Sequence, residues 1–146
     1  MRRLATTASL TTLAVIAFGA VTLVALEGQT VAVLQTTKPT GDLRRTHVWV
    51  ARDDDGSLWI ESATASRPFY LDLAAQPALL IEIRRYGLDR NPVVLRGRAA
   101  FVPDPVGHAR IRTLLSAAYG WADSWVALLT DTSQSRAVRI TVETPP

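Results

Sequence analysis

The sequence contains no cysteine and only two histidines, His47 and His108. Without cysteine the chain can form no disulfide, no thiolate metal site, no cysteine nucleophile and no lipid attachment through a thiol. Two histidines are too few for a histidine-built metal centre, so we predict no metal site. The sequence also lacks the G-x-S-x-G, G-x-G-x-x-G and P-loop patterns, and Asp53–Asp55 lacks the downstream glutamate of a calcium loop. No standard hydrolytic or phosphate-binding motif is therefore present.

Lysine is almost absent as well. One lysine and fifteen arginines give the 146 residues a formal net charge of +3. The arginines are scattered and form no basic stripe interleaved with aromatic residues, which argues against nucleic-acid binding. The positive charge fits a phosphate-bearing ligand or anionic lipid headgroups instead. A hydrophobic content of 48% is typical of a globular chain.

An uncharged run, Leu4–Leu26, follows Arg2 and Arg3. As a helix, about 23 residues span the hydrocarbon core of a bilayer, so we predict that residues 1–27 form a single-pass N-terminal membrane anchor. A cleaved signal peptide and a buried soluble helix are the alternatives, but the run has neither a clean small-x-small cleavage site nor a polar face. The two arginines favour a cytoplasmic N-terminus, whereas basic residues beyond the run weaken that assignment. The side of the membrane that holds the remaining domain, residues 28–146, stays open.

Six short segments of that domain have the pattern of β-strands, with β-branched residues or alternating apolar and polar side chains. They are Val31–Thr37, Arg45–Arg52, Ser57–Ala63, Ala78–Arg85, Val93–Val102 and Ala137–Val142. Pro39 and Gly41 mark the first turn, and Asp55-Gly56 is a tight hairpin signal. Residues 86–91 are a predicted loop, and Gly97 indicates a bulge or a bend.

Three helical segments accompany the strands. The predicted helices are Pro68–Gln76, Pro105–Tyr119 and Trp121–Leu129. Trp121 and Trp125 lie four residues apart, a spacing that favours a place in the core. A lid over a planar ligand and a contact with the lipid interface are the alternatives. The count predicts a mainly β (α+β) fold, a small antiparallel barrel of about six strands with short helices.

Polar groups are concentrated in the first turn, where Lys38, Thr40, Gly41 and Arg44 offer an ammonium group, a hydroxyl, backbone N–H groups and a guanidinium. This composition fits an anion site. An ordinary polar hairpin with solvated charges has the same composition, and the residues alone favour it.

A second candidate segment, Ser62–Tyr70, combines small residues with Arg67 as an anion donor and with Tyr70, which could hydrogen-bond a substrate carbonyl. A helix start with a surface arginine is the plainer interpretation. His47 lies alone on a predicted strand and is expected to pack or hydrogen-bond rather than catalyse, and we assign no role to His108.

Taken together, these blocks resemble the deazaflavin-dependent nitroreductase family, within the flavin-binding split-barrel (pyridoxamine-phosphate-oxidase-like) superfamily. The family turn T-T-G-R-K-S-G-x-x-R-x-T-P-L is similar to Gln35–Val48, with Lys38 at a basic position, Thr40 at the serine and Thr46 at the threonine. The family block P-x-W-Y-x-N-L-x-A-N-P is similar to Arg67–Pro77. The stretch Ala118–Trp125 is similar to the closing segment of membrane-anchored actinobacterial members.

This resemblance implies a split β-barrel that binds reduced deazaflavin coenzyme F420, or alternatively FMN. It implies an oxidoreductase that transfers hydride to a small-molecule electron acceptor such as a quinone or a nitroarene, and a possible homodimer. The implied catalytic residues at the acceptor are Tyr70 and Tyr119. The implied cofactor-binding residues are Lys38, Thr40, Gly41, Arg44, Thr46, Ser62, Ala63 and Arg67. In such enzymes the cofactor supplies the redox chemistry and the protein positions it.

The chain also departs from the family pattern. Pro39 stands at a usual lysine, His47 at a proline and Phe69 at a tryptophan, and the glycine pair expected near residues 64–66 is absent. These departures leave open a different flavin and also a non-catalytic split-barrel module that binds a ligand or a partner. A barrel that handles haem or pyridoxal phosphate is a third possibility.

Overall fold

The fold is described from a computed structural model that covers residues 2–27, 29–84 and 92–143. The elements in chain order are α1 (Arg2–Glu27), β1 (Val31–Thr37), β2 (Leu43–Arg52), β3 (Leu58–Ser62), α2 (Pro68–Ala75), β4 (Ala78–Arg84), β5 (Val93–Val102), α3 (Val106–Tyr119), α4 (Trp121–Leu129) and β6 (Arg136–Val142). The predicted strands and helices are all confirmed, and only their bounds shift. The predicted loop over 86–91 lies outside the described residues.

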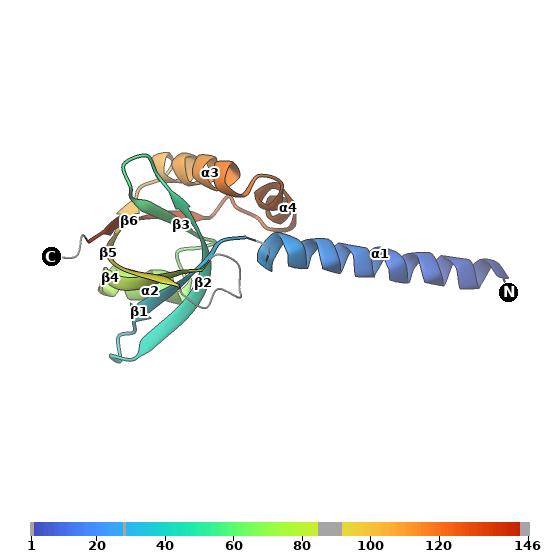
Figure 1. Ribbon diagram of the computed structural model, residues 1–146, viewed down its shortest axis with the longest axis horizontal. Coiled ribbons are helices and arrows are strands. Elements are labelled where there is room, and N and C mark those ends of the chain that lie inside the picture. Colours follow the sequence, from blue (N-terminus) through green and yellow to red (C-terminus); the bar gives the residue numbers. More distant parts are fainter. Residues whose placement is uncertain (1, 28, 85–91, 144–146) are drawn as a thin grey trace.

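The six strands are antiparallel and close into a barrel in the order β1–β2–β3–β6–β5–β4, with β4 returning to pair with β1 (Figure 1). The predicted six-strand antiparallel barrel is thus confirmed. Alternating side chains point into the barrel, so that Leu34, Ile60, Ile81 and Ile140 form a fully buried inner core. Helix α2 adds Phe69 to the same core.

Gly97 was predicted to mark a bulge or a bend, and a bulge is absent there. The register of β5 passes Gly97 without interruption, towards Leu79 of β4 on one side and Val142 of β6 on the other. A Cβ atom at this position would lie 2.7 Å from Cγ2 of Ile140. Glycine is required here because Ile140 already fills the space inside the barrel.

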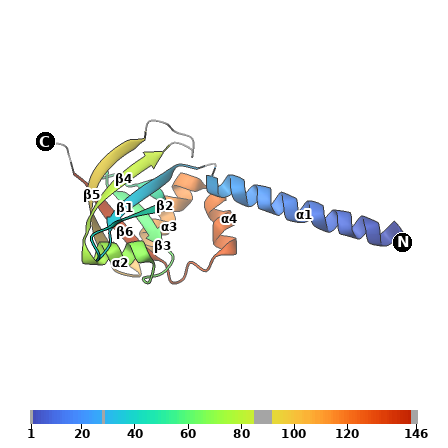
Figure 2. The ribbon, with the colours of Figure 1, turned by 90° about the horizontal axis from the view of Figure 1, so that it is seen from below.

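Helix α3 covers the outer face of β2, β3 and β6, as both ribbon views show (Figures 1 and 2). Its residues Ile111, Leu115 and Tyr119 pack on Trp59 and Ala51 in a second buried cluster outside the barrel. The predicted alternation of β3 is confirmed, because Trp59 faces this outer cluster while its neighbour Ile60 faces the inner core.

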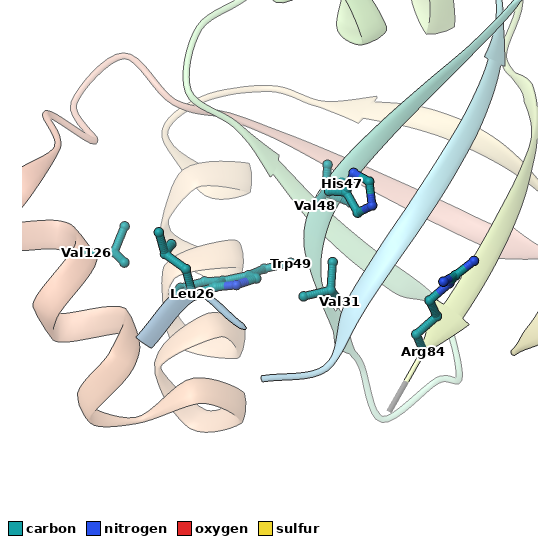
Figure 3. A pocket seen from close by; sticks show the side chains of 7 residues that line it. All are labelled: Leu26, Val31, His47, Val48, Trp49, Arg84 and Val126. Carbon is teal, nitrogen blue, oxygen red and sulfur yellow. The ribbon is translucent and has the colours of Figure 1, made fainter. Parts of the chain in front are cut away.

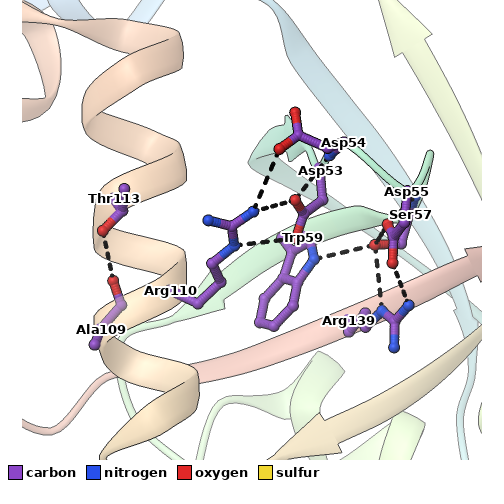
Figure 4. A network of polar contacts seen from close by, with 9 residues as sticks. All are labelled: Asp53, Asp54, Asp55, Ser57, Trp59, Ala109, Arg110, Thr113 and Arg139. Carbon is purple, nitrogen blue, oxygen red and sulfur yellow. Dashed lines mark hydrogen bonds and ion pairs between the residues drawn. The ribbon is translucent and has the colours of Figure 1, made fainter.

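The predicted hairpin between β2 and β3 is held by paired charges (Figure 4). Arg110 of α3 donates from Nε to Asp53 (3.1 Å), and this hydrogen bond is the main cause that lowers the pKa of Asp53. Arg139 of β6 contacts Asp55 and Ser57, and Ser57 Oγ accepts a hydrogen bond from the indole N–H of Trp59 (3.1 Å). Asp53 and Asp55 therefore fasten the turn to α3 and β6, whereas Asp54 is exposed and lies 4.0 Å from Arg110.

Helix α1 extends away from the barrel in both views (Figures 1 and 2) and contacts α4 near its C-terminal end. Phe18 lies 5.4 Å from Trp125, measured between ring centroids, and the Trp125 indole donates to Thr22 Oγ1 (3.2 Å). The prediction of a helix over the N-terminal run is confirmed. Within the described part of the chain, however, no helix combines the length and apolar character needed to cross a bilayer. The structure therefore gives no support to the transmembrane part of that prediction.

The prediction that Trp121 and Trp125 belong to the core was wrong. Trp121 is 54% exposed, and Trp125 is half-buried against α1 rather than against the barrel. The buried residues of α4 are Ala122 and Asp123. A spacing of four residues places two side chains on one face of a helix, but it does not indicate that this face packs on another helix, as α4 does on α1.

Candidate functional site

Strand β2 is where the barrel opens. It pairs with β1 from Leu43 to Trp49, but among the described residues it pairs with β3 only from Val50 to Arg52. Strand β3 ends at Ser62, and the chain then turns into α2. The first half of β2 therefore has an edge that no neighbouring strand of the described chain covers. Such an edge presents backbone N–H and C=O groups that can bind a ligand.

Two cavities meet at this half of β2, and both are lined by His47, Val48 and Trp49 of β2 and by Val126 of α4. We call them together the split groove. The larger cavity, about 450 Å³, is also lined by Leu26, Val31 and Arg84, and it lies over β1, β2 and β4 because Val31 is paired with Trp49 on one side and with Arg84 on the other (Figure 3). The smaller, about 260 Å³, extends towards α2, and its further lining includes Thr46, Glu61, Ala63, Arg67 and Ser135. The larger cavity alone has the volume of a typical small-molecule site.

Cationic side chains flank the split groove. Arg67 is exposed at the α2 side, and Arg84 lies at the β4 side. Arg84 Nε and Arg45 Nη2 both donate to the buried Glu82, each at 2.8 Å, and the hydrogen bond from Arg84 is the main cause that lowers the pKa of Glu82. Two guanidinium groups share one carboxylate, so a net positive charge remains at the β4 end of the groove, whereas Glu61 and Asp131 add negative charge to the lining of the smaller cavity. The positive charge favours an anionic ligand.

Trp49 forms part of the groove wall, and its ring stacks on Tyr119 with centroids 4.6 Å apart and an interplanar angle of 13°. The Tyr119 hydroxyl accepts from the backbone N–H of Val50 (2.9 Å) and lies within bonding distance of the carbonyl oxygens of Val50 (2.8 Å) and Thr30 (2.9 Å). Burial raises the pKa of Tyr119 to about 12. The hydroxyl is thus committed to the backbone.

This placement corrects the expected role of Tyr119. A phenol that faces an electron acceptor needs a free hydroxyl. Tyr119 is instead 5% exposed, and its hydroxyl bonds to the backbone of β2 at Val50. Tyr70 also lies away from the lining of the split groove. It packs on the inner core beside Phe101, with ring centroids 4.6 Å apart, and burial raises its pKa. The structure does not bring the two tyrosines together.

The predicted anion clamp lies in the turn beyond the groove. Lys38 Nζ is 3.8 Å from Asp42 Oδ2, and Thr40 donates to the same oxygen (2.9 Å). Gly41 has a φ of 89°, which the turn requires and which glycine adopts without strain. The side chain of Lys38 is 35% exposed, so part of it is accessible to an anion.

Arg44 has a different environment from the rest of the predicted clamp. Its Nε donates to Asp72 Oδ2 of α2 (2.6 Å), and Thr36 Oγ1 donates to the same oxygen (2.9 Å). Asp72 and Thr36 are both buried. Arg44 therefore joins β2 to α2 through its Nε, which is already bonded to a carboxylate.

Three of the predicted cofactor-binding residues, Thr46, Ala63 and Arg67, do line the split groove. Ser62 is buried next to them and donates to the backbone oxygen of Thr64 (2.7 Å). The predicted residues thus fall into two groups, one at the groove and one at the turn.

Sequence reasoning missed the groove residues that β2 and β4 contribute, Trp49 and Arg84, and assigned His47 to packing. The signal was the alternation of β2, which places His47 and Trp49 on the outer face opposite Val33 and Val31. That signal identifies an outer face but not the gap beside it, because the gap depends on where β3 stops pairing.

The geometry defines a class of protein: a split barrel with a groove beside the half of β2 that β3 does not pair with. No family model and no curated protein matches the sequence. Solved structures do share the fold, which is that of the pyridoxamine-phosphate-oxidase-like split barrels, as the sequence resemblance implied.

Three of these structures illustrate the range of proteins with this fold. An F420 reductase has a TM-score of 0.59 at 20% identity, over 84% of this chain and 93% of its own. A FAD-binding protein from Mesorhizobium loti has a TM-score of 0.58 at 21% identity, over 82% of this chain and 86% of its own. HutZ, the heme storage protein from Vibrio cholerae, has a TM-score of 0.59 at 14% identity, over 83% and 86%. At these identities the likeness establishes the fold alone.

Proposed function

We propose that this protein is a split-barrel oxidoreductase that binds a reduced deazaflavin of the F420 type in the split groove, with FMN as the alternative cofactor. The observation that carries the proposal is the uncovered edge of β2, which lies in a groove with an aromatic wall and cationic flanks. Solved proteins of this fold include an F420 reductase and a FAD-binding protein, which supports a ligand of this chemical class.

The residues of the groove fit such a cofactor in three respects. The backbone of β2 around His47 offers donors and acceptors in the plane of the strand, which suits the polar edge of a flat ring. Trp49 and Val126 offer apolar surface for its faces. Arg67 and Arg84 offer positive charge for its anionic portion.

When bound, a reduced deazaflavin or flavin supplies the hydride. The side chains of this protein would orient the ring, exclude water from it and hold its charge. The anionic tail would run along β2 towards Arg45 and Lys38, which keeps the turn as an outer and weaker part of the site. Tyr70 retains a proposed role only if the acceptor reaches the core side of α2.

A lipophilic acceptor such as a quinone is the class that we propose, because Leu26, Val31 and Val126 line the part of the groove next to α1. Membrane attachment through residues 4–26 belongs to the same proposal and is supported by the sequence run alone. Fractionation of cells that express the full chain tests it: the protein is expected in the membrane pellet after a high-salt wash. A homodimer is a further proposal, which light scattering of the purified full chain tests.

A non-catalytic binding module is the second candidate. The observation in its favour is that neither predicted catalytic tyrosine lies on the groove, and a heme storage protein shares the fold. Such a module would bind its ligand in the same place without turning it over.

Cofactor titration separates these functions. Reduced F420 and FMN are each titrated against the full chain and followed by cofactor fluorescence, and Arg67→Ala is expected to weaken binding about tenfold, the equivalent of about 1.4 kcal/mol. Arg98→Ala, an exposed arginine on β5 that does not line the groove, is the matched control. Binding of neither cofactor by the wild type contradicts the proposed cofactor class. Binding without oxidation by a quinone or a nitroarene supports the module.

A further inference from the structure

A chain of hydrogen bonds leads from the split groove to the start of α3. Glu61 and Ser135 both line the groove. Ser135 Oγ donates to Glu61 Oε1 (2.7 Å), and His108 Nδ1 lies 2.9 Å from the same hydroxyl oxygen. Ser135 is 1% exposed, whereas His108 is half-buried. Solvent therefore reaches the histidine end of this hydrogen-bond chain more readily than the serine in its middle.

The direction of the hydrogen bonds follows from the serine. A hydroxyl has one hydrogen to donate, and that hydrogen is directed at Glu61. The contact between Ser135 and His108 then requires Nδ1 of the histidine to carry the donated hydrogen. The three groups are consequently aligned as donor, relay and acceptor, with the acceptor carboxylate at the groove.

Glu61 also belongs to a cluster of ion pairs next to these hydrogen bonds. Arg112 of α3 donates from Nη1 to Glu61 Oε2 (3.0 Å) and from Nη2 to both oxygens of Asp123 of α4 (2.7 and 2.6 Å). One guanidinium is shared by two carboxylates, so the cluster has a net negative charge. Asp131 lines the groove nearby, and Arg136, which follows Ser135, pairs with Asp104 (2.8 Å).

We propose that Glu61, Ser135 and His108 form a proton path that connects the split groove with solvent. The inference rests on the proposed function, because a hydride transfer to a quinone or a nitroarene consumes a proton for each hydride. A flat ligand in the groove excludes the water that would otherwise supply this proton. The path passes through the protein wall and stays open while the groove is filled.

The proton balance is complete. Protonated His108 passes the proton at Nδ1 to Ser135, and Ser135 passes its own proton to Glu61. Glu61 gives that proton to the acceptor, which has received two electrons and one hydrogen as hydride, and the carboxylate is restored. His108 then takes one proton from solvent, so one hydride and one proton together reduce the acceptor by two electrons.

The first arm of the test needs no cofactor. In nitrogen-15-labelled full-length protein, NMR is expected to detect a slowly exchanging Nδ1–H on His108. Ser135→Ala is expected to abolish the protection of this Nδ1–H from solvent exchange. The matched control is Ser116→Ala, because Ser116 is an exposed serine on α3, the helix that holds His108. An unprotonated Nδ1 on His108 in the wild type would reverse the direction of the serine hydrogen bond and overturn the proposal.

The second arm uses protein loaded with the reduced cofactor that binds. Stopped-flow mixing with menadione in a weak buffer that contains a pH indicator follows cofactor oxidation and proton uptake together. His108→Asn keeps a donor nitrogen in the Nδ1 position but cannot carry a proton. It is expected to slow both signals at least tenfold at pH 7 and to remove the pH dependence of the rate, with partial rescue by added imidazole. Glu61→Gln is expected to slow both signals without imidazole rescue.

The outcomes distinguish a failure of the proposed function from a failure of the proton path. A wild type that binds neither cofactor contradicts the proposed function, and the proton path falls with it. Equal rates in the wild type and in His108→Asn, with cofactor bound, overturn the proton path and leave the proposed function standing. If these hydrogen bonds only held α3 to β3, His108→Asn would lower the midpoint of thermal unfolding, and added imidazole would not restore the rate. That result also overturns the proton path.

Discussion

The β1–β2 turn and the split groove are the two regions that contain the predicted cofactor-binding residues, and they differ in how their polar groups are used. In the turn, Lys38 and Thr40 pair with Asp42 only a few residues away, and the neighbouring Arg44 is held by Asp72. In the groove, the edge of β2 is not covered by a described strand, and Arg67 is exposed beside it.

The difference between these regions teaches that composition and availability are separate properties. The turn has the composition of an anion site, but its groups mostly bind one another. The groove has an ordinary composition, and its capacity to bind comes from the point at which β3 stops pairing with β2. We therefore place the main binding energy at the groove and a smaller, charge-dependent share at the turn.

The largest expected effect concerns the carboxylate that occupies Arg44. Asp72→Ala removes the acceptor of one buried and one partly buried hydrogen bond and leaves a partly buried guanidinium without its partner. We expect the free energy of unfolding to fall by about 2–3 kcal/mol, less than the full cost of breaking a buried ion pair because Arg44 is partly exposed. Urea unfolding of the full chain measures it. Asp42→Ala, which removes the exposed partner of Lys38, is the control, with an expected loss below about 0.5 kcal/mol. Equal losses would mean that Arg44 is as free to bind a ligand as Lys38.

The next effect concerns the support beneath the groove. Tyr119→Phe removes the hydroxyl that holds the backbone of β2, and we expect a loss of about 1–2 kcal/mol in unfolding free energy. The pKa of Tyr119 in the folded protein, about 12, exceeds the ordinary tyrosine pKa of 10.0. The stabilisation is therefore complete below pH 10 and is lost as the pH rises towards 12. Unfolding free energies measured from pH 9 to 12 should decline more steeply in the wild type than in Tyr119→Phe. Parallel curves would show that the phenol is not buried as described.

The smallest effect separates the two regions directly. Lys38→Ala is expected to weaken cofactor binding about threefold at low ionic strength and hardly at all in 0.5 M salt, because exposed charges are screened. A tenfold loss that persists in high salt would move the main anion site to the turn.

Much of the fold was predictable from local patterns. The alternation of β4 and β6 identified their inner faces, and Pro39, Gly41 and Asp55-Gly56 marked the turns, because strand periodicity and turn chemistry are local properties. The groove was only partly predictable. Thr46, Ala63 and Arg67 followed from the family resemblance, whereas Trp49, Arg84, Glu61 and Ser135 come together through strand order and through the packing of α3 and α4. Tyr119 was misassigned because nothing local indicates that its hydroxyl bonds to the backbone of a strand 69 residues away.

The central claim is that the ligand binds at the edge of β2 in the split groove. The most direct measurement is a titration of nitrogen-15-labelled full-length protein with reduced F420, and in parallel with reduced FMN, followed by the backbone amide shifts. The largest changes are predicted at Thr46–Trp49, with smaller changes at Lys38–Asp42. Changes confined to Lys38–Asp42, with the Thr46–Trp49 amides unmoved at saturation, would contradict the account.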